Sequence, residues 1–176
     1  MALASRADIV VDQAALNGSY QILYYSPTGQ SFTAASDQLI SFDFYFRTFN
    51  PGFGNNPLTI DILDGDGLGG PVLASSTFSL ADGFDGLAGA TFNLNVITGN
   101  VYTAVVSTSS IYWGLGANTF DVYSGGQLYA GNSLGWGDVT FRATFADASV
   151  PESGTTLLLV GGALSALALF RRRFQG

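Results

Sequence analysis

Hydrophobic and polar residues alternate most regularly between residues 38 and 49. Four large apolar side chains, Ile40, Phe42, Phe44 and Phe46, are separated there by more polar residues. A period of two is typical of a β-strand with one buried face, because successive side chains point to opposite sides of a sheet. The pattern therefore predicts a long strand whose four apolar residues cover a core.

Other short apolar runs repeat this pattern along the chain and are separated by turn-forming residues. The clearest runs span residues 59–63, 92–96, 101–106, 120–122 and 139–145. Glycine-rich or proline-containing turns lie between them, including residues 27–29, 50–52, 64–67, 98–100 and 124–126. We expect residues 92–96 and 101–106 to pair as a hairpin across the turn at Gly99.

The number and spacing of these runs indicate the fold class. At least eight short strands with Gly-rich turns favour an all-β, antiparallel β-sandwich of the jelly-roll type over a simple meander. Residues 8–149 are predicted to form this domain. Residues 1–7 are either the remnant of a signal peptide or a disordered leader, and residues 150–176 form a separate tail.

The tail contains an uncharged apolar segment followed by a basic cluster. Residues 155–170 carry no charge, and Arg171, Arg172 and Arg173 follow directly. A helix of this length covers roughly 24 Å, slightly less than a bilayer core of roughly 30 Å. A buried core helix is the alternative, but a terminal segment that is apolar all round favours a single transmembrane helix. The arginines place the tail end in the cytoplasm and the domain outside.

Charge excludes one class of partner. Between residues 8 and 150 twelve aspartates face two arginines, Arg47 and Arg142, which gives a formal charge of −10. Such a surface repels phosphate backbones, and nucleic-acid binding requires a basic stripe that the sequence lacks. We therefore expect no nucleic-acid partner.

The junction between domain and tail resembles a known sorting signal. Val150, Pro151, Glu152, Ser153 and Gly154 precede the apolar span and the arginine cluster. This order resembles the PEP-CTERM class of bacterial sorting signals, and VPESGTT is closest to the variant that reads VPDSGST. Ser153 replaces the second proline of the common form and leaves the exosortase subtype open.

The resemblance implies where the protein goes. It implies export through a Sec-type signal peptide, transient anchoring in the inner membrane, and removal of the tail by an exosortase-type membrane protease. It also implies a bacterium with an outer envelope and extracellular polysaccharide. The domain is similar to the β-rich passenger domains that precede such tails, so the mature protein is expected in the cell envelope or outside the cell.

Residue types argue against an enzyme. The chain has no histidine, lysine or cysteine, which removes the commonest general bases and covalent nucleophiles. A glycanase built on two carboxylates would have to use aspartates, such as Asp82 with Asp85 or Asp61 with Asp64. Solvated turn residues are the simpler interpretation, and we expect no catalysis.

A calcium site is the second chemical candidate. Asp61, Asp64 and Asp66 offer hard oxygen ligands next to a flexible loop, as calcium prefers. The loop does not follow the EF-hand spacing, since Leu68 and Ser75 occupy its fifth and twelfth positions counted from Asp64. A hairpin turn, in which Asp-Gly pairs supply positive φ angles, is the favoured interpretation. No other cofactor is expected.

Aromatic residues suggest a third possibility, a sugar-binding surface. Five of them cluster in the last third of the domain: Tyr112, Trp113, Tyr123, Tyr129 and Trp136. Flat rings stack on the apolar faces of sugars, and Gly-flanked tryptophans suit exposed loops. Core packing is the alternative for each residue taken singly.

Together these features predict a surface or matrix protein with weak affinity for extracellular polysaccharide. An aspartate-based polysaccharide hydrolase and a purely structural, calcium-stabilised module are the alternatives.

Overall fold

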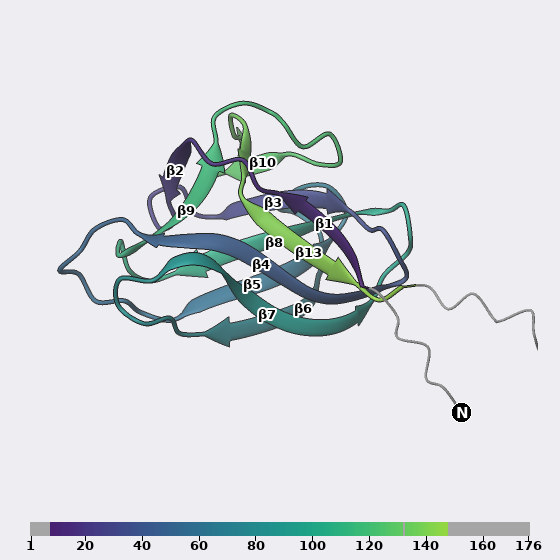
Figure 1. The fold of residues 1–176 in the computed structure, drawn as a ribbon, viewed down its shortest axis with the longest axis horizontal. Helices are drawn as coiled ribbons and strands as arrows, with labels where there is room; N and C mark the ends of the chain where they lie inside the picture. Colours follow the sequence, from purple (N-terminus) through teal and green to yellow (C-terminus); the bar gives the residue numbers. More distant parts are fainter. Residues whose placement is uncertain (1–7, 132, 148–176) are drawn as a thin grey trace, which may run out of the picture.

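The computed structural model describes residues 8–131 and 133–147, and these form two antiparallel sheets (Figure 1). No helix in this part of the chain has the length and hydrophobicity that a membrane crossing requires. The predicted transmembrane helix, the motif at residues 150–154 and the three terminal arginines lie outside the described residues. The strands are β1 (Ile9–Gln13), β2 (Gly18–Gln21), β3 (Thr28–Thr33), β4 (Gln38–Thr48), β5 (Leu58–Asp64), β6 (Val72–Phe78), β7 (Asp85–Asn95), β8 (Val101–Thr108), β9 (Trp113–Asn118), β10 (Leu128–Ala130), β11 (Ser133–Leu134), β12 (Asp138–Val139) and β13 (Phe141–Phe145).

Strand β4 is the centre of the first sheet. One of its edges pairs with β7, and the other pairs with β13 and then β9 along its length. Strand β1 adds to β13, while β2 and β12 pair with β9. The second sheet has the order β11-β10-β3-β8-β5-β6. The prediction of an all-β fold with two antiparallel sheets is therefore confirmed.

The phenylalanines of β4 form the core between the sheets. Phe42, Phe44 and Phe46 are fully buried, as their alternation predicts. The Phe42 ring lies 5.0 Å from that of Phe32 on the facing sheet and stacks at 5.4 Å on Phe141 of its own sheet. These aromatic contacts join both sheets into one hydrophobic cluster.

Ile40 departs from the predicted alternation. The pairing of β4 with β7 shifts register between Leu39 and Ser41, and the pairing with β13 shifts at the same place. Such a β-bulge inserts one residue and reverses which neighbours face the core. Leu39 is therefore fully buried and Ile40 only partly buried, so the prediction for Ile40 is wrong.

The predicted hairpin between residues 92–96 and 101–106 is also wrong. The first segment belongs to β7 and pairs with β4, whereas β8 lies in the other sheet between β3 and β5. The turn between them is tied to the β3–β4 connection, because Gly99 donates to the carbonyl of Ala34 at 2.8 Å. A turn that reads as a hairpin in sequence thus carries the chain from one sheet to the other.

The strand expected at residues 120–122 is a loop, and the neighbouring strand β9 was not predicted. The sequence of β9, WGLGAN, reads as a loop because its glycines lack side chains. Those glycines are needed for packing: a Cβ at Gly116 would lie 2.6 Å from Leu16 Cδ1 and 2.8 Å from Tyr45 Cδ1. Close approach of neighbouring side chains, rather than turn formation, explains this glycine.

A buried carboxylate connects the two sheets and the loop at residues 119–127. Asp138 of β12 is fully buried, and its Oδ1 accepts a hydrogen bond from Gln30 Nε2 of β3 at 3.0 Å. Its Oδ2 accepts the backbone N–H groups of Val122 and Tyr123 at 2.8 and 2.9 Å. Gln30 completes the link by accepting the Val139 N–H at 3.1 Å. Three donors therefore depend on one carboxylate.

We predict that Asp138→Asn lowers the free energy of unfolding by about 3 kcal/mol, because its amide group turns a donor toward groups that need an acceptor. The melting temperature should fall by roughly 10 °C in thermal unfolding followed by circular dichroism. Asp121→Asn, an exposed change in the same loop, is the matched control and should stay within about 0.5 kcal/mol. Equal effects at the two positions would contradict the role given to Asp138.

Candidate ligand-binding site

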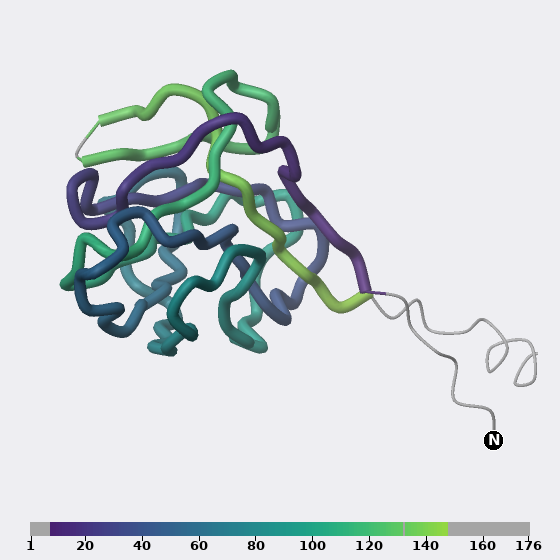
Figure 2. The backbone as a smooth tube through the Cα atoms, turned by 60° about the vertical axis from the view of Figure 1, so that its left-hand side comes forward, coloured from purple at the N-terminus to yellow at the C-terminus, as the bar shows by residue number. Residues whose placement is uncertain are grey.

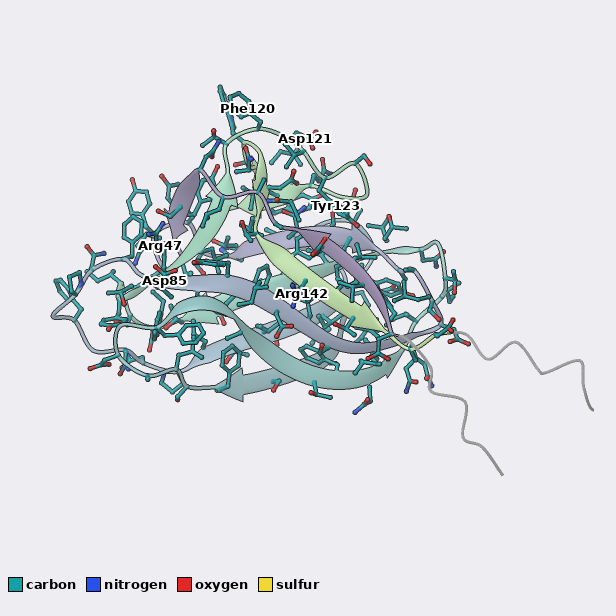
Figure 3. The ribbon with its side chains drawn as sticks, viewed as in Figure 1. Arg47, Asp85, Phe120, Asp121, Tyr123 and Arg142 are labelled. Atoms are coloured by element: carbon teal, nitrogen blue, oxygen red, sulfur yellow. The ribbon has the colours of Figure 1, made fainter. Side chains whose placement is uncertain are left out.

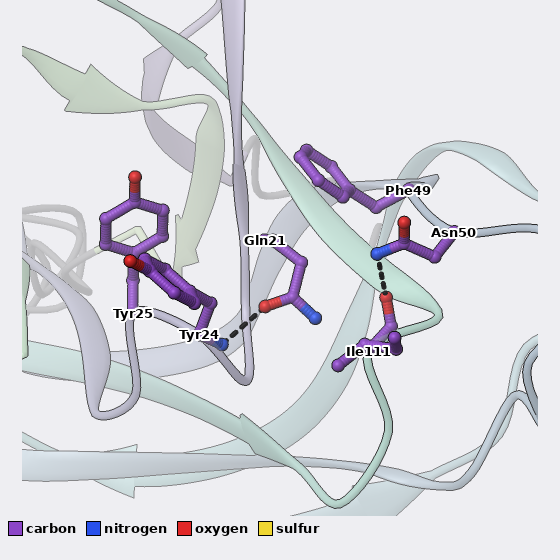
Figure 4. A pocket seen from close by; sticks show the side chains of 6 residues that line it. All are labelled: Gln21, Tyr24, Tyr25, Phe49, Asn50 and Ile111. Atoms are coloured by element: carbon purple, nitrogen blue, oxygen red, sulfur yellow. Dashed lines mark hydrogen bonds between the residues drawn. The ribbon is translucent and has the colours of Figure 1, made fainter.

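Two adjacent pockets open at the end of the sandwich where β4 ends and β9 begins. The first has a volume of about 350 Å³ and is lined by Gln21, Tyr24, Tyr25, Phe49, Asn50 and Ile111 (Figure 4). The second has about 240 Å³ and is lined by Tyr20, Tyr25, Ala130, Ser133, Leu134, Gly135 and Trp136. Tyr25 lines both pockets. The two hollows thus form one aromatic surface, which is built from the β2–β3, β4–β5, β8–β9 and β11–β12 loops and the β10–β11 hairpin.

The loop after β2 presents two tyrosines and is held by hydrogen bonds. Gln21 Oε1 accepts the backbone N–H of Tyr24, and the Gln21 carbonyl accepts that of Tyr25 at 3.2 Å. The Tyr25 carbonyl in turn accepts the Gly131 N–H at 2.7 Å. The Tyr24 and Tyr25 rings meet edge to face at 4.9 Å. Tyr24 nevertheless remains 79% exposed, so its ring is available to a ligand.

The opposite wall of the first pocket is Phe49 and Asn50, just after β4. The Phe49 N–H donates to the Tyr112 carbonyl at 2.7 Å. Asn50 Nδ2 donates to the Ile111 carbonyl at 2.9 Å (Figure 4). These bonds fix the start of the β4–β5 loop against the β8–β9 loop. Asn50 Oδ1 has no donor among the described residues.

Trp136 forms the outer edge of the second pocket and is 84% exposed. Its position follows from Gly137, whose φ of +84° only glycine adopts easily, and from buried Asp138 one residue further on. The Tyr20 hydroxyl donates to the Trp136 carbonyl. Burial raises the pKa of the Tyr20 phenol, and the nearby Tyr25 raises it further, so this hydroxyl stays protonated near neutral pH.

Gln21 lies at the floor of the first pocket with one polar atom unused. The side chain is only 5% exposed, and its Nε2 has no hydrogen-bond partner among the described residues. Figure 4 shows this nitrogen pointing away from Tyr24 and toward the wall formed by Asn50 and Ile111. The indole Nε1 of Trp113 is also buried without a partner there, but Trp113 lines neither pocket.

Of the five aromatic residues predicted to bind a ligand, only Trp136 is an exposed ring beside a pocket. The expectation of an exposed ring is wrong for Trp113, which is 0% exposed, and for Tyr112, which is also buried. Strand β9 draws both into the core, where their rings meet at 4.7 Å. Tyr123 is half-buried and packs edge to face on Phe141 at 5.0 Å. Burial raises the pKa of the Tyr123 phenol.

Tyr129 serves the structure of the β5–β6 turn. Its hydroxyl donates to Asp66 Oδ1 at 2.8 Å and lies 2.6 Å from Gln127 Nε2, which donates to it. Burial, followed by the hydrogen bond to Asp66, raises the pKa of this phenol. The ring is thereby committed to a contact inside the protein.

The three aspartates considered for calcium are not brought together. Among the described residues no group of three or more carboxylates could hold a metal ion. Asp66 bonds to Tyr129 and Gln127, while Gly65 and Gly67 have φ angles of +86° and +119°. The positive φ angles confirm the turn predicted for this segment.

The other acidic candidates lie away from both pockets. Asp85 pairs with Arg47 at 3.8 Å across β7 and β4, at the edge of the sheet (Figure 3). Neither pocket is lined by an aspartate or an arginine. The aromatic surface is therefore uncharged, which suits binding through ring faces and amides.

Sequence reasoning missed Tyr20, Tyr24, Tyr25 and Phe49. The available signal was the Tyr24-Tyr25 pair immediately before the turn at Pro27, because adjacent aromatics in a turn cannot both face a core. Gln21 carries no such signal. Its exposure and partners depend on loops that come together only in the fold.

The fold comparisons are weak. A crystal structure of the infectious bursal disease virus VP2 subviral particle is 14% identical with a TM-score of 0.33, over 84% of this chain and 35% of that chain. A structure of the Gx strain of the same virus is 14% identical with a TM-score of 0.26, over 89% and 50%. This chain thus spans half or less of the length of each. No curated protein sequence matches the chain.

The sequence comparison concerns the tail. Residues 149–174 match the family described as VPDSG-CTERM motif. The match covers the Val-Pro-Glu-Ser-Gly element, the apolar span and the arginine cluster, in the order on which the resemblance rests. The chain therefore carries a C-terminal VPDSG-CTERM sorting signal, a PEP-CTERM-like exosortase signal, behind a β-rich passenger domain.

Proposed function

We propose that the protein is an exported envelope or matrix component that binds extracellular polysaccharide through the aromatic surface at the β2–β3 end of the sandwich. The observation that carries this proposal is the pair of uncharged pockets lined by Tyr20, Tyr24, Tyr25, Phe49 and Trp136. Aromatic faces beside amide groups are the features that sugar rings use, since one face of a sugar is apolar and its rim is polar.

The sorting signal supports the location. A C-terminal VPDSG-CTERM motif indicates an exported protein that is processed at its C-terminus by an exosortase-type membrane protein. We propose that the apolar span at residues 155–170 anchors the chain in the inner membrane until processing. The mature domain then reaches the envelope or the extracellular matrix.

The geometry of β4 supports an outward-facing binding surface. Leu39 near the start of β4 pairs with Phe145, the last residue of β13, and Thr48 at the end of β4 pairs with Trp113. Strand β4 therefore runs from the end of β13, called the chain exit below, to the pockets. Strand β1 begins beside the end of β13, at the opposite end from the β4–β5 loop (Figures 1 and 2). Ten residues of strand place the pockets roughly 30 Å from the exit. A domain tethered by its C-terminus would present the pockets away from the membrane.

We propose binding rather than catalysis. No carboxylate lines either pocket, whereas glycoside hydrolysis generally needs two that flank the scissile bond. The proposal needs no metal or cofactor.

We also propose that the sandwich is of the jelly-roll type. Strand pairing supports this through the orders β2-β9-β4-β7 and β3-β8-β5-β6, in which the chain repeatedly crosses between the sheets. Eight strands in two sheets joined by such crossings are typical of jelly rolls. The remaining strands extend the two sheets.

We predict that Tyr24→Ala and Trp136→Ala each weaken retention on polysaccharide from the host matrix about tenfold in affinity electrophoresis, because each removes an exposed stacking ring. Phe120→Ala is the matched control, since Phe120 is 69% exposed but lines neither pocket (Figure 3). Unchanged retention of both variants, or an equal loss with Phe120→Ala, would contradict the proposal.

We further predict that the wild-type chain, expressed in a bacterium with an exosortase, loses its C-terminal segment and is recovered from the envelope or medium. Pro151→Ala should retain the full mass in the inner membrane, because the motif is changed while the apolar span and arginines remain. Intact-mass spectrometry of each fraction measures both. Full-length wild-type protein in the inner membrane would show that the tail is an ordinary anchor.

A further inference from the structure

We infer that the first pocket is a subsite for one neutral sugar ring, in which Gln21 Nε2 donates a hydrogen bond to a ring hydroxyl. This inference rests on the proposed polysaccharide binding and adds a place and a chemical class to it. It begins from the buried amide nitrogen of Gln21, which lacks a partner among the described residues. A buried donor without an acceptor is costly, so such groups are rare without a reason.

The orientation of the Gln21 amide is fixed by its neighbours. Its Oε1 accepts the backbone N–H of Tyr24, which determines that the other end of the amide is the NH₂ group. That group faces the wall formed by Asn50 and Ile111 in Figure 4. A flipped amide would set two donors against each other. The direction of the donor is thus set before any ligand arrives. Because the nitrogen itself is buried, a ligand hydroxyl reaches it only when neighbouring side chains of the pocket shift.

The pocket also supplies an acceptor and two apolar walls. Asn50 Nδ2 is used by the Ile111 carbonyl, which leaves Asn50 Oδ1 to accept from a ligand hydroxyl. Tyr24 and Phe49 contribute exposed rings on opposite sides of the pocket. A sugar ring has hydroxyls that both donate and accept at its rim and C–H groups on its faces. Its chemistry therefore matches the lining group by group.

Charge selects a neutral sugar. The lining of the first pocket contains no cation that could pair with a carboxylate or sulfate. Between residues 8 and 150 twelve aspartates outweigh two arginines, one of which already pairs with Asp85. An anionic polysaccharide would therefore meet repulsion and would find no compensating contact at this pocket.

The second pocket extends the site along a chain. It shares Tyr25 with the first and ends at Trp136, and a hydrogen bond from Tyr20 holds the Trp136 backbone. The rings of Tyr20 and Tyr25 meet edge to face at 5.5 Å. Two adjacent pockets that share the Tyr25 side chain suit neighbouring sugar units of an oligosaccharide better than one small molecule.

The test uses the full chain, purified in a detergent without a sugar headgroup. Cellotetraose, maltotetraose and tetragalacturonate are titrated by calorimetry, with the first two as neutral probes and the third as the anionic one. Gln21→Met removes the donor at nearly constant side-chain volume, but it also removes the acceptor of the Tyr24 N–H. Gln38→Met makes the same change at the first residue of β4, at the end of the strand that lies away from the pockets, and is the matched control. Side-chain amide signals of Gln21 in the wild-type protein, followed by NMR, provide a readout that does not depend on the folding of a variant.

We expect at least one neutral probe to bind and to shift the Gln21 Nε2 proton signals. We also expect Gln21→Met to bind it about tenfold more weakly, Gln38→Met to match the wild type, and tetragalacturonate to bind at least about tenfold more weakly than the neutral probe. Binding with unshifted Gln21 signals and an unaffected Gln21→Met would overturn the subsite while leaving polysaccharide binding intact. Tighter binding of tetragalacturonate would overturn the choice of a neutral sugar. If neither these probes nor host polysaccharide binds, the proposed function fails together with the inference.

Discussion

The packing of the β4 phenylalanines between the two sheets is the interaction on which the rest of the structure depends. Phe42 contacts Phe32 and Phe46 contacts Phe78 on the facing sheet, and the buried Phe44 ring packs between them. Strand β4 is paired along both edges, with β7 on one side and β13 and β9 on the other. With no cysteine in the chain, no disulfide can replace this core. Strand β4 also sets the long axis of the domain, since one end lies beside the chain exit and the other beside the pockets.

The loops of the candidate site are held to the sandwich by hydrogen bonds. The β2–β3 loop is tied to Gln21 and Gly131, the start of the β4–β5 loop to Tyr112 and Ile111, and the Trp136 carbonyl to the Tyr20 hydroxyl. Loops that are already ordered lose little conformational entropy when a ligand binds. Two buried polar side chains in this region differ in their hydrogen bonding. Both carboxylate oxygens of Asp138 have donors in the protein, whereas Gln21 Nε2 has no acceptor among the described residues.

Sequence patterns predicted the features that depend on local periodicity or on contiguous motifs. The alternation in β4, the Asp-Gly turn after β5 and the sorting signal at residues 149–174 are of this kind. The bulge at Ile40 and the crossing between sheets at Gly99 were not predicted, because each is decided by the partner strand. The candidate site was predicted only at Trp136. Trp113 is also flanked by glycine, but it begins β9, which pairs with β2 and β4, and its ring is therefore buried in the core. The sequence alone does not show this pairing.

The central claim, that the aromatic end of the sandwich contacts polysaccharide, can be measured by hydroxyl-radical footprinting. Tyr24, Trp136 and Phe120 are comparably exposed in the free protein, so their oxidation by radicals can be compared directly by mass spectrometry. With host matrix polysaccharide present, we predict that Tyr24 and Trp136 are protected from oxidation while Phe120 is not. Unchanged oxidation of all three residues, or protection confined to Phe120, would contradict the account.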